Sequence, residues 1–470
     1  MADCAKHFAV IEETLGEALA LHQSGQLAAA EKRYREILAV CGDQAEVLYY
    51  LGLLCQADGR LDEALRHLEA ARQRDPQQAD AHLAVGALHQ RLGAYVEAVD
   101  ACREAVNLAP EHGPAWYNLG AASFAAGQLH EAIAAYERAV ACTPDDVDSF
   151  YNLAIAYDRA GQPDDAIRAY DRAMELAPTD PDIPYNLALL YKRAHSFALA
   201  QRYLEQTIAI AADYAPAYTH LAAIYGRLGR SDEAIRCYER LLELGHDEEA
   251  ARHMLAALRG ERLEVVAAGY VRKLFDGYAD SFEQELVAKL GYTAPRRLRQ
   301  LVGSLLPVGN RLDRVLDLGC GTGLAGEVFR DLATTLIGVD LSPRMVALAE
   351  QKRIYDALKV GEIVEFCCQQ TERCDCIVAA DVLVYLGEIA PFFAAVAKIL
   401  VPGGLFAFST ERCEEGFVLR PTGRHAHATD YVAEVAAACG LRVVLQEETR
   451  LRREKEAWLI GDLFVLAAGV

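Results

Sequence analysis

Small residues recur every 34 positions along the first half of the 470-residue chain. Small residues at fixed intervals let two helix backbones pack closely, and proline ends a helix because it lacks the N–H that a helix interior uses. The pattern therefore predicts that each unit is a helix, a short turn and a second helix. One phase of the period comprises Ala30, Ala64, Ala98, Ala132, Ala166, Ala200 and Ala234. A second comprises Ala18, Gly52, Gly86, Gly120, Ala154, Ala188 and Ala222, and a third carries Pro76, Pro110, Pro144 and Pro178.

Seven such units in unbroken register resemble tetratricopeptide repeats and cover about residues 11–248. Units of this kind bury their apolar faces by stacking, which produces a solenoid with a concave groove. The resemblance implies that a protein or peptide binds in the groove, with a scaffold or self-association surface as the alternative. The dipeptide Tyr-Asn recurs at Tyr117–Asn118, Tyr151–Asn152 and Tyr185–Asn186. These asparagines either bind the backbone of a ligand or reflect only the repeat consensus.

After residue 248 the period ends, and short β-rich runs then alternate with helical ones. The runs include "RVLDLG", "TLIGVD", "ALKVG", "CIVAAD" and "LFAFST". Such alternation predicts βαβ units, and hence a Rossmann-like α/β domain with a parallel sheet and helices on both faces.

A glycine-rich turn follows the first of these runs and admits two interpretations. Gly321, Gly323 and Gly326 spell the G-x-G-x-x-G fingerprint of dinucleotide sites. Asp317, Gly319, Gly321 and Gly323 spell D-x-G-x-G-x-G, a turn that holds S-adenosylmethionine. The Asp317 carboxylate would repel a pyrophosphate, whereas it would attract the ammonium and sulfonium of S-adenosylmethionine. We therefore favour S-adenosylmethionine and keep a nicotinamide-dependent oxidoreductase as an alternative.

Acidic residues also stand at the ends of the next three runs. Asp340 is placed to accept hydrogen bonds from both hydroxyls of a ribose, a feature that fits either cofactor. Glu362 is placed to accept from an adenine amino group, and Asp381 ends the fourth run. The alternative is that these carboxylates only cap the helices that follow.

Residues 265–470 resemble class I S-adenosylmethionine-dependent methyltransferases, and more closely the bacterial predicted methyltransferases with tetratricopeptide repeats. The methyltransferase-like proteins of the Williams–Beuren region are a related group. The resemblance rests on "FDGYADSFEQELVAKLGYTAPRRL", "VLDLGCGTG", "GVDLSPRMVALA", "AADVLVYLG", "PGGLFAFSTE" and "GRHAHATDY". It implies a seven-stranded sheet with a reversed last strand, and an aromatic segment containing Phe275, Tyr278 and Phe282 that folds over the cofactor. The family more often has Asp at the position of Glu362.

The resemblance and the strand-end acids together define a candidate cofactor site. Its residues are Asp317, Gly319, Gly321, Gly323, Asp340, Leu341, Met345, Glu362, Ile363, Asp381 and Tyr278. We accordingly divide the chain into a repeat solenoid (1–248), capping and linker helices with the cofactor lid (249–310), and a methyltransferase domain (311–470).

Methyl transfer needs positioning of the acceptor and, where the acceptor arrives protonated, a base. The candidate catalytic residues are His427, Tyr431 and Asp381, with His425 a weaker candidate and Arg424 suited to holding an acidic group of the substrate. The "DVLVYL" stretch lacks an Asn-Pro-Pro-Tyr type signature, which disfavours glutamine, adenine and cytosine as acceptors. The expected function is methyl transfer to a protein, carrier-bound or small-molecule acceptor recruited by the repeats. The alternative is a scaffold with a catalytically silent cofactor domain.

The composition of the chain limits the kinds of partner, cellular location and metal site that we expect. A net charge of -21 disfavours binding to nucleic acid, which requires clustered Lys and Arg. The apolar stretch from Ile377 to Leu400 is interrupted by charged residues, and the N-terminus lacks the features of a secretory signal, so we expect a cytoplasmic protein without a membrane span. Thirteen cysteines without C-x-x-C spacing favour reduced thiols, and we expect no metal site.

Overall fold

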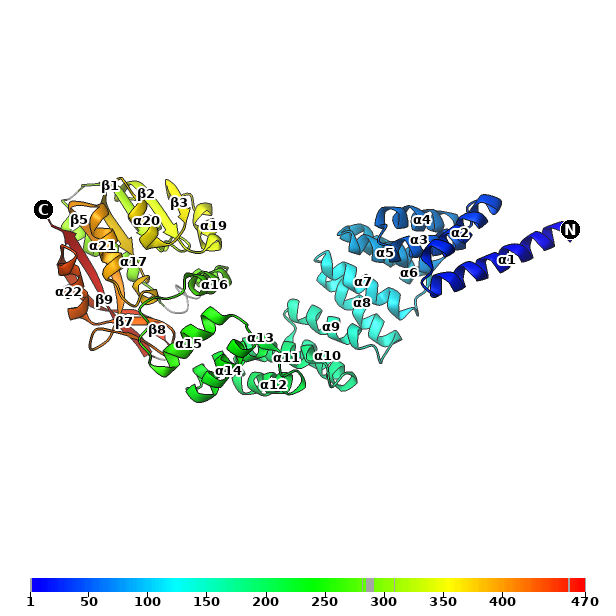
Figure 1. Cartoon of the computed structure of the whole chain (residues 1–470), viewed down its shortest axis with the longest axis horizontal. Coiled ribbons are helices and arrows are strands. Elements are labelled where there is room, and N and C mark those ends of the chain that lie inside the picture. Colours follow the sequence, from blue (N-terminus) through cyan, green and yellow to red (C-terminus); the bar gives the residue numbers. More distant parts are fainter. Residues whose placement is uncertain (1, 281, 285–290, 308, 455–456, 470) are drawn as a thin grey trace. The chain divides into compact units, whose positions relative to one another are not determined.

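The computed structural model describes residues 2–280, 282–284, 291–307, 309–454 and 457–469 (Figure 1). The chain forms two compact units, Met1–Ala217 and Tyr218–Val470. The division falls within the seventh predicted repeat, whereas the sequence-based boundary stands at residue 248. Part of the predicted lid, residues 281 and 285–290, lies outside the described residues. None of the described helices combines the length and apolarity needed to cross a membrane.

The first unit consists of helix pairs joined by short turns, as the 34-residue period predicts (Figure 1). The last helix, α13 (Ala215–Arg227), crosses the division between the units. The others are α1 (Ala2–Gln23), α2 (Leu27–Cys41), α3 (Ala45–Ala57), α4 (Leu61–Arg74), α5 (Ala79–Arg91), α6 (Tyr95–Leu108), α7 (Gly113–Ala125), α8 (Leu129–Cys142), α9 (Val147–Arg159), α10 (Pro163–Leu176), α11 (Asp182–Arg193) and α12 (Phe197–Ile210).

The small residues of the period lie where helices pack most closely. All seven alanines of the first phase are fully buried. In the second phase, a Cβ atom added to Gly52 would lie 2.6 Å from Cγ of Leu68, and one added to Gly120 would lie 2.7 Å from the ring of Tyr136. A small residue on one helix therefore faces a large one on the next, which confirms the predicted packing.

The turn inside each helix pair needs a left-handed backbone. Gly59, Gly93, Gly127 and Gly161 occupy this turn at intervals of 34 residues, with φ between 75° and 80°. The corresponding position in the next pair is His195, whose φ is 57°. A side chain with a Cβ atom is unfavourable in this conformation, so this turn stores strain that the others do not.

The second unit contains further helices and one mixed sheet. Its helices are α14 (Ser231–Glu243), α15 (Glu248–Arg259), α16 (Ala268–Tyr278), α17 (Ala294–Leu305), α18 (Leu324–Phe329), α19 (Pro343–Gln351), α20 (Ile363–Gln369), α21 (Ala390–Ile399), α22 (Thr429–Ala438) and the 3-10 helix η2 (Leu383–Tyr385). Its strands are β1 (Leu312–Leu318), β2 (Ala333–Asp340), β3 (Ala357–Val360), β4 (Cys374–Ala379), β5 (Leu400–Arg412), β6 (Phe417–Leu419), β7 (His425–His427), β8 (Leu441–Glu454) and β9 (Ala457–Ala468).

The sheet has the topology expected from the sequence, with one addition. Strands β3, β2, β1, β4 and β5 are parallel neighbours in that order. β9 then pairs antiparallel with both β5 and β8, which gives the expected seven strands with a reversed last strand. The addition is the short hairpin of β6 and β7, which pairs with the end of β5 at Glu411 and Arg412.

Hydrophobic cores lie on both faces of the sheet, because side chains alternate along each strand. One core includes Leu298 of α17, Phe329 of α18 and Val315 of β1. The other includes Leu316 of β1 together with residues of α20, α21 and α22. The sheet is thus covered on both sides, and its functional groups must lie at the strand ends.

The segment before the sheet is fastened to the β6–β7 hairpin. Nε2 of His253 in α15 donates to the Gly423 carbonyl oxygen at 2.7 Å. Nε2 of His425 donates to the Leu263 carbonyl at 2.9 Å, and the Glu388 N–H donates to the Glu264 carbonyl at 3.1 Å. Residues 248–266 therefore form part of the second unit.

Candidate functional site

The glycine-rich loop after β1 has a backbone that other residues adopt with difficulty. Gly319, Gly321 and Gly323 have φ angles of 71°, 53° and 97°. The loop folds back on β2, because the N–H groups of Gly319 and Cys320 both donate to the Val339 carbonyl, at 2.8 and 3.0 Å. Glycine is required here because these positive φ values penalise a Cβ atom. The loop then leads into α18, with Gly323 as its N-cap residue.

Asp340 connects the end of β2 to this loop. Its Oδ2 accepts from the Gly321 N–H and its Oδ1 from the Ser342 N–H, both at 2.8 Å. Burial raises the pKa of this carboxyl, and the two backbone N–H groups oppose that rise. Each oxygen keeps acceptor capacity, because a carboxylate oxygen has two lone pairs.

Asp317 occupies a different position from the one expected. It does not line the cavity described below. Its Oδ2 accepts from the Tyr355 hydroxyl at 2.6 Å, and it is almost fully buried beneath the loop. Burial raises the pKa of this carboxyl to about 7. Asp317 therefore lies behind the loop, hydrogen-bonded to Tyr355, and does not line the cavity.

A cavity opens at the carboxyl ends of β1, β2, β3 and β4. Its lining includes seven of the eleven predicted cofactor residues: Gly319, Gly321, Asp340, Leu341, Glu362, Ile363 and Asp381. Asp317, Gly323, Met345 and Tyr278 do not line it. Met345 is buried in α19, where its N–H donates to the Ser342 hydroxyl, and the Tyr278 side chain is exposed.

Glu362 both lines the cavity and caps a helix. Its Oε2 accepts from the Glu365 N–H at 2.7 Å at the start of α20. The capping alternative considered from the sequence is therefore correct as far as this contact goes. The capping contact does not exclude a second acceptor role, because the side chain also faces the cavity.

Asp381 follows β4 in a left-handed conformation, with φ of 62°. Its Oδ1 lies 2.8 Å from Nη2 of Arg424 and 3.3 Å from Nη1 of Arg452. Burial alone would raise the pKa of Asp381, but the two guanidinium groups hold it below its usual value. The carboxylate is therefore a stable anion that is already paired with cations, and this makes it a poor base.

Aromatic residues before the sheet form one wall of the cavity. Phe275 of α16 and Phe282 line it, and their ring centroids are 6.1 Å apart. Phe275 also packs edge-on against Tyr385, with centroids 5.2 Å apart. This wall is attached to α19, because Arg344 donates to the Asp276 carbonyl at 3.0 Å. The arrangement agrees with an aromatic segment over the cavity, although Tyr278 is not part of it.

The two histidines of β7 lie away from the cavity. His425 and His427 are fully buried, and Nε2 of His427 donates to the Gly387 carbonyl at 3.0 Å. Burial lowers the pKa of His427 to about 4. Tyr431 stacks on His427 with centroids 6.1 Å apart and likewise does not line the cavity. The structure thus does not bring His427 and Tyr431 together with the loop and the acids.

The Tyr-Asn pairs of the first unit form a ladder. Nδ2 of Asn152 donates to the Tyr117 hydroxyl at 3.3 Å, and Nδ2 of Asn186 donates to the Tyr151 hydroxyl at 2.8 Å. Each amide nitrogen also donates to a backbone carbonyl four residues earlier. The recurring dipeptide therefore contributes to the packing between successive repeats.

Family models match both parts of the chain. A model described as "Methyltransferase domain" matches residues 290–437. Models described as "Tetratricopeptide repeat" match residues 15–65, 113–179 and 215–244. The chain joins tetratricopeptide repeats to a methyltransferase domain. A further model, described as anaphase-promoting complex, cyclosome, subunit 3, matches residues 57–139 within the repeats.

Curated relatives of the methyltransferase domain include two ubiquinone biosynthesis O-methyltransferases. The one from Xanthomonas oryzae is 28% identical over 155 residues, which are 29% of this chain and 64% of the relative. The one from Rhodopseudomonas palustris is 33% identical over 103 residues, or 21% of this chain and 39% of the relative. The matches thus span less than two thirds of these relatives.

Solved structures similar to the chain are repeat proteins. MamA from Desulfovibrio magneticus is 25% identical, with 37% of this chain and 98% of that chain covered and a TM-score of 0.35. YrrB, described as a TPR protein with an unusual peptide-binding site, is 22% identical, with 39% and 95% covered and a TM-score of 0.37.

Sequence reasoning missed several residues that line the cavity of the methyltransferase domain. Val266, Val271, Tyr292 and Tyr385 belong to its wall but were not among the predicted site residues. Tyr292 and Tyr385 stand in two of the motifs that carried the resemblance, "GYTAP" and "DVLVYLG". Tyr292 stands two residues before α17 and Tyr385 ends the short helix η2 after β4, so an aromatic residue in either connection is the signal that could have identified these wall residues.

Proposed function

We propose that the chain is an S-adenosylmethionine-dependent methyltransferase whose repeats recruit a protein or carrier-bound acceptor. The observation that carries this proposal is the cavity where the Gly319–Gly323 loop meets Asp340 at the strand ends. Ligands of open α/β sheets bind at such strand ends, beside the first glycine-rich turn.

The residues of the cavity fit this cofactor. The Asp340 oxygens each accept one backbone N–H and retain a lone pair for a ribose hydroxyl. Leu341 and Ile363 offer apolar contacts for an adenine ring, with Glu362 next to them as an acceptor for its amino group. Of the strand-end acids that line the cavity, Asp340 and Glu362 have no arginine partner among the described residues, and their carboxylates favour a ligand that carries an ammonium and a sulfonium. Gly319 and Gly321 let the ligand approach the backbone.

The cofactor supplies a methyl group that its sulfonium has already activated. The chain itself binds the cofactor and the methyl acceptor, orients them and encloses them. Phe275 and Phe282 cover the cavity and exclude water, which strengthens the electrostatic effect of the nearby carboxylates. Tyr385 is held in place by Arg424, whose Nη1 donates to its hydroxyl at 2.9 Å. Among the described residues, no histidine lines the cavity. This favours an acceptor that arrives with a lone pair already available.

Calorimetric titration of the full chain with S-adenosylmethionine tests the cofactor assignment. We expect binding to weaken by about tenfold to a hundredfold in Asp340→Ala, since hydrogen bonds to a charged group contribute about 1.5–3 kcal/mol. Asp313→Ala is the matched control, because this exposed aspartate lies at the opposite end of the neighbouring strand β1. Equal affinity for S-adenosylmethionine in wild type and Asp340→Ala would contradict the assignment of the cofactor site. Stabilisation of the chain against thermal unfolding by NAD, but not by S-adenosylmethionine, would indicate an oxidoreductase.

The ladder of asparagines supports a recruiting role for the repeats. In the described part of the chain, the amide oxygens of Asn118, Asn152 and Asn186 make no hydrogen bond, whereas their amide nitrogens all do. A half-exposed amide oxygen is an acceptor for a peptide N–H. We expect the double variant Asn152→Ala, Asn186→Ala to lower methyl labelling of proteins in a lysate and to leave S-adenosylmethionine affinity unchanged.

A second candidate function is a scaffold whose methyltransferase domain binds the cofactor without turnover. Two observations favour it: Asp381 is paired with two arginines, and neither His427 nor Tyr431 lines the cavity. Incubation of the full chain with lysate and cofactor carrying a labelled methyl group separates the two functions. Transfer of label to a macromolecule or a small molecule supports the enzyme, and tight binding without any transfer supports the scaffold.

We also propose a cytoplasmic setting, supported by the thiols: the described cysteines form no disulfide. Reduced cysteines in this number are typical of a reducing compartment.

A further inference from the structure

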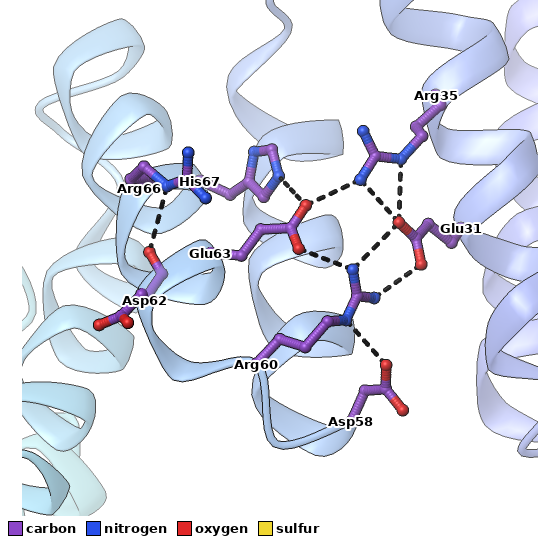
Figure 2. A network of polar contacts seen from close by, with 8 residues as sticks. All are labelled: Glu31, Arg35, Asp58, Arg60, Asp62, Glu63, Arg66 and His67. Atoms are coloured by element: carbon purple, nitrogen blue, oxygen red, sulfur yellow. Dashed lines mark hydrogen bonds and ion pairs between the residues drawn. The ribbon is translucent and has the colours of Figure 1, made fainter.

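Three residues with different metal-binding chemistry meet in the second repeat. Cys55 lies in α3, and Glu63 and His67 lie one turn apart in α4. One ligand atom from each lies within 4.8 Å of the other two. Nε2 of His67 is 3.6 Å from Oε1 of Glu63 (Figure 2). Because α3 and α4 form one helix pair, a single short turn fixes the relative position of all three.

The other repeats show that this combination is not required by the fold. Glutamate recurs at the position of Glu63, as Glu97, Glu131 and Glu233. Cysteine and histidine do not recur together at the other two positions. The residues equivalent to Cys55 are Leu21, His89, Ser123, Tyr157, Tyr191 and Tyr225, and those equivalent to His67 are Arg33, Ala101, Ala135, Ala169, Tyr203 and Cys237. Only the second repeat therefore combines a thiol and an imidazole with the recurrent carboxylate.

We propose that Cys55, Glu63 and His67 bind one Zn²⁺ ion, with the fourth position of a tetrahedral site open to solvent. Zn²⁺ takes thiolate, imidazole and carboxylate ligands, and three protein ligands with one open position is an established arrangement. The thiolate and the carboxylate together neutralise the ion. On binding, the Cys55 thiol loses its proton to solvent and its sulfur lone pair forms the bond to zinc.

The ligands are chemically available. Nε2 of His67 lies 3.6 Å from Oε1 of Glu63, and a neutral imidazole nitrogen offers a lone pair to a metal. The side chains of Glu63 and His67 are 24% and 21% exposed, so an ion has access from solvent.

Two arginines already contact Glu63, and the ion pairs around them allow Glu63 to exchange an arginine contact for a metal ion. Oε1 of Glu63 accepts from Arg35 at 2.8 Å, and Oε2 accepts from Arg60 at 2.7 Å. Both arginines also pair with Glu31, at 2.7 and 2.6 Å, and Arg60 pairs with Asp58 at 2.8 Å (Figure 2). Arg35 therefore keeps a carboxylate partner when Oε1 of Glu63 turns to the metal, so no buried charge is left unpaired.

Small side-chain movements complete the site. Ligand atoms bonded to one tetrahedral zinc at about 2.0–2.3 Å are separated by about 3.5 Å. The three atoms here lie within 4.8 Å of one another, so rotation of the two partly exposed side chains on α4 closes the remaining gap. The buried thiol on α3 need not move.

Titration of the full-length, reduced chain with Co²⁺ tests the proposal, because cobalt reports a thiolate ligand through a charge-transfer absorption band and a tetrahedral site through visible bands. We expect one equivalent to bind with both signatures, and Zn²⁺ to displace it. Loss of an outer partner alone weakens metal binding by about 10–100-fold, so Cys55→Ser and His67→Ala are each expected to weaken it at least about tenfold.

The chain itself offers folding controls for these variants. Ser123 stands at the position equivalent to Cys55, and Ala101 stands at the position equivalent to His67. Circular dichroism is therefore expected to match that of wild type. Cys368→Ser, at an exposed cysteine of the methyltransferase domain, controls for adventitious thiol binding and is expected to change nothing.

Two outcomes overturn the proposal. One is the absence of a thiolate band in wild type. The other is cobalt binding that is as tight in Cys55→Ser or His67→Ala as in wild type, or a band that disappears in Cys368→Ser. As an independent measurement, Zn²⁺ is expected to raise the Tm of wild type but not that of His67→Ala.

Discussion

Arg424 and Asp381 form an ion pair beside the cavity, with Nη2 of the arginine 2.8 Å from Oδ1 of the carboxylate. Arg452 lies 3.3 Å from the same oxygen. Glu411 accepts from Arg424 and Arg452 through one oxygen, at 2.7 and 2.8 Å. Two arginines and two carboxylates are thus paired near the ends of β4, β5 and β8 and just before β7, and one of them, Asp381, lines the cavity.

Arg424→Ala is expected to destabilise the methyltransferase unit by about 3–5 kcal/mol, since it leaves Asp381 with Arg452 alone and Glu411 with Arg452 and the more distant Arg420. The measurement is urea unfolding followed by Trp458 fluorescence in a Trp116→Phe background, which isolates the signal of the second unit. Arg420→Ala is the matched control. The Arg420 side chain is 31% exposed and lies 3.7 Å from Glu411, so its loss is expected to cost much less. Equal destabilisation by both variants would contradict the assigned role of the pair.

Asp317→Asn is expected to change how stability depends on pH. Because the folded-state pKa of about 7 lies above the ordinary value of 3.8, wild type has the full contribution of this group below about pH 4 and loses it as pH rises to about 7. Asparagine cannot ionise and still accepts from the Tyr355 hydroxyl. The stability of the variant relative to wild type should therefore rise between pH 4 and 7 and level off above, by up to about 4 kcal/mol.

The same fluorescence assay at pH 4.5, 6 and 8 measures this difference. Buried histidines also affect stability in this range, with the opposite sign, but they are common to both proteins and cancel in the comparison. A constant difference across the range would show that Asp317 is already ionised in the folded state throughout.

His427→Asn is expected to affect stability rather than catalysis. The imidazole donates to the Gly387 carbonyl within the protein and does not line the cavity. Its folded-state pKa of about 4 lies below the ordinary value of 6.5, so its contribution is present above pH 6.5 and lost as pH falls towards 4. The variant should show a weaker loss of stability on acidification.

The catalytic readout for His427→Asn is the pH profile of kcat, measured with the acceptor that the labelling experiment identifies. We expect the profile to keep its shape. Disappearance of its acidic limb, with KM unchanged, would instead restore His427 as the base that the sequence indicated.

His195→Gly is expected to stabilise the repeat unit by about 1 kcal/mol, because the left-handed backbone at this turn costs histidine more than glycine. His195→Ala keeps the strain and is the matched control. Unfolding followed by Trp116 fluorescence in a Trp458→Phe background reports the first unit. A destabilised glycine variant would mean that the contact between the rings of His195 and Phe197, 5.9 Å apart, outweighs the strain.

The sequence was sufficient for features that are local or periodic. The 34-residue alanine phase predicts buried contacts because a repeat faces the same neighbour each time, and all seven alanines are buried. The glycine loop and Asp340 are predictable because one strand-end turn determines their geometry. Asp317 was expected at the cofactor site; it stands two residues before the loop but does not line the cavity. On β1 it alternates with Leu316 and Leu318, so its side chain turns towards Tyr355 and away from the cavity.

Features that depend on long-range pairing were not predictable. The three-residue strands β6 and β7 are too short to show a periodic pattern, and their pairing with β5 decides that His427 is buried. The Arg452 contact joins residues 71 positions apart. The proposed zinc site has no C-x-x-C spacing in the sequence, because its ligands Cys55 and His67 come from two helices and meet only across the α3–α4 turn.

The backbone contacts of Leu263 and Glu264 have a practical consequence for recombinant fragments. A clone trimmed to the matched residues 290–437 would lack these acceptors and would leave the buried imidazole of His425 without its partner, the Leu263 carbonyl. It would also lack β8 and β9, and so leave the edge of β5 open to intermolecular pairing. If such a clone were insoluble, the cause would be the position of the truncation and not a property of the full chain. Fragments should therefore start before α15 and retain β9.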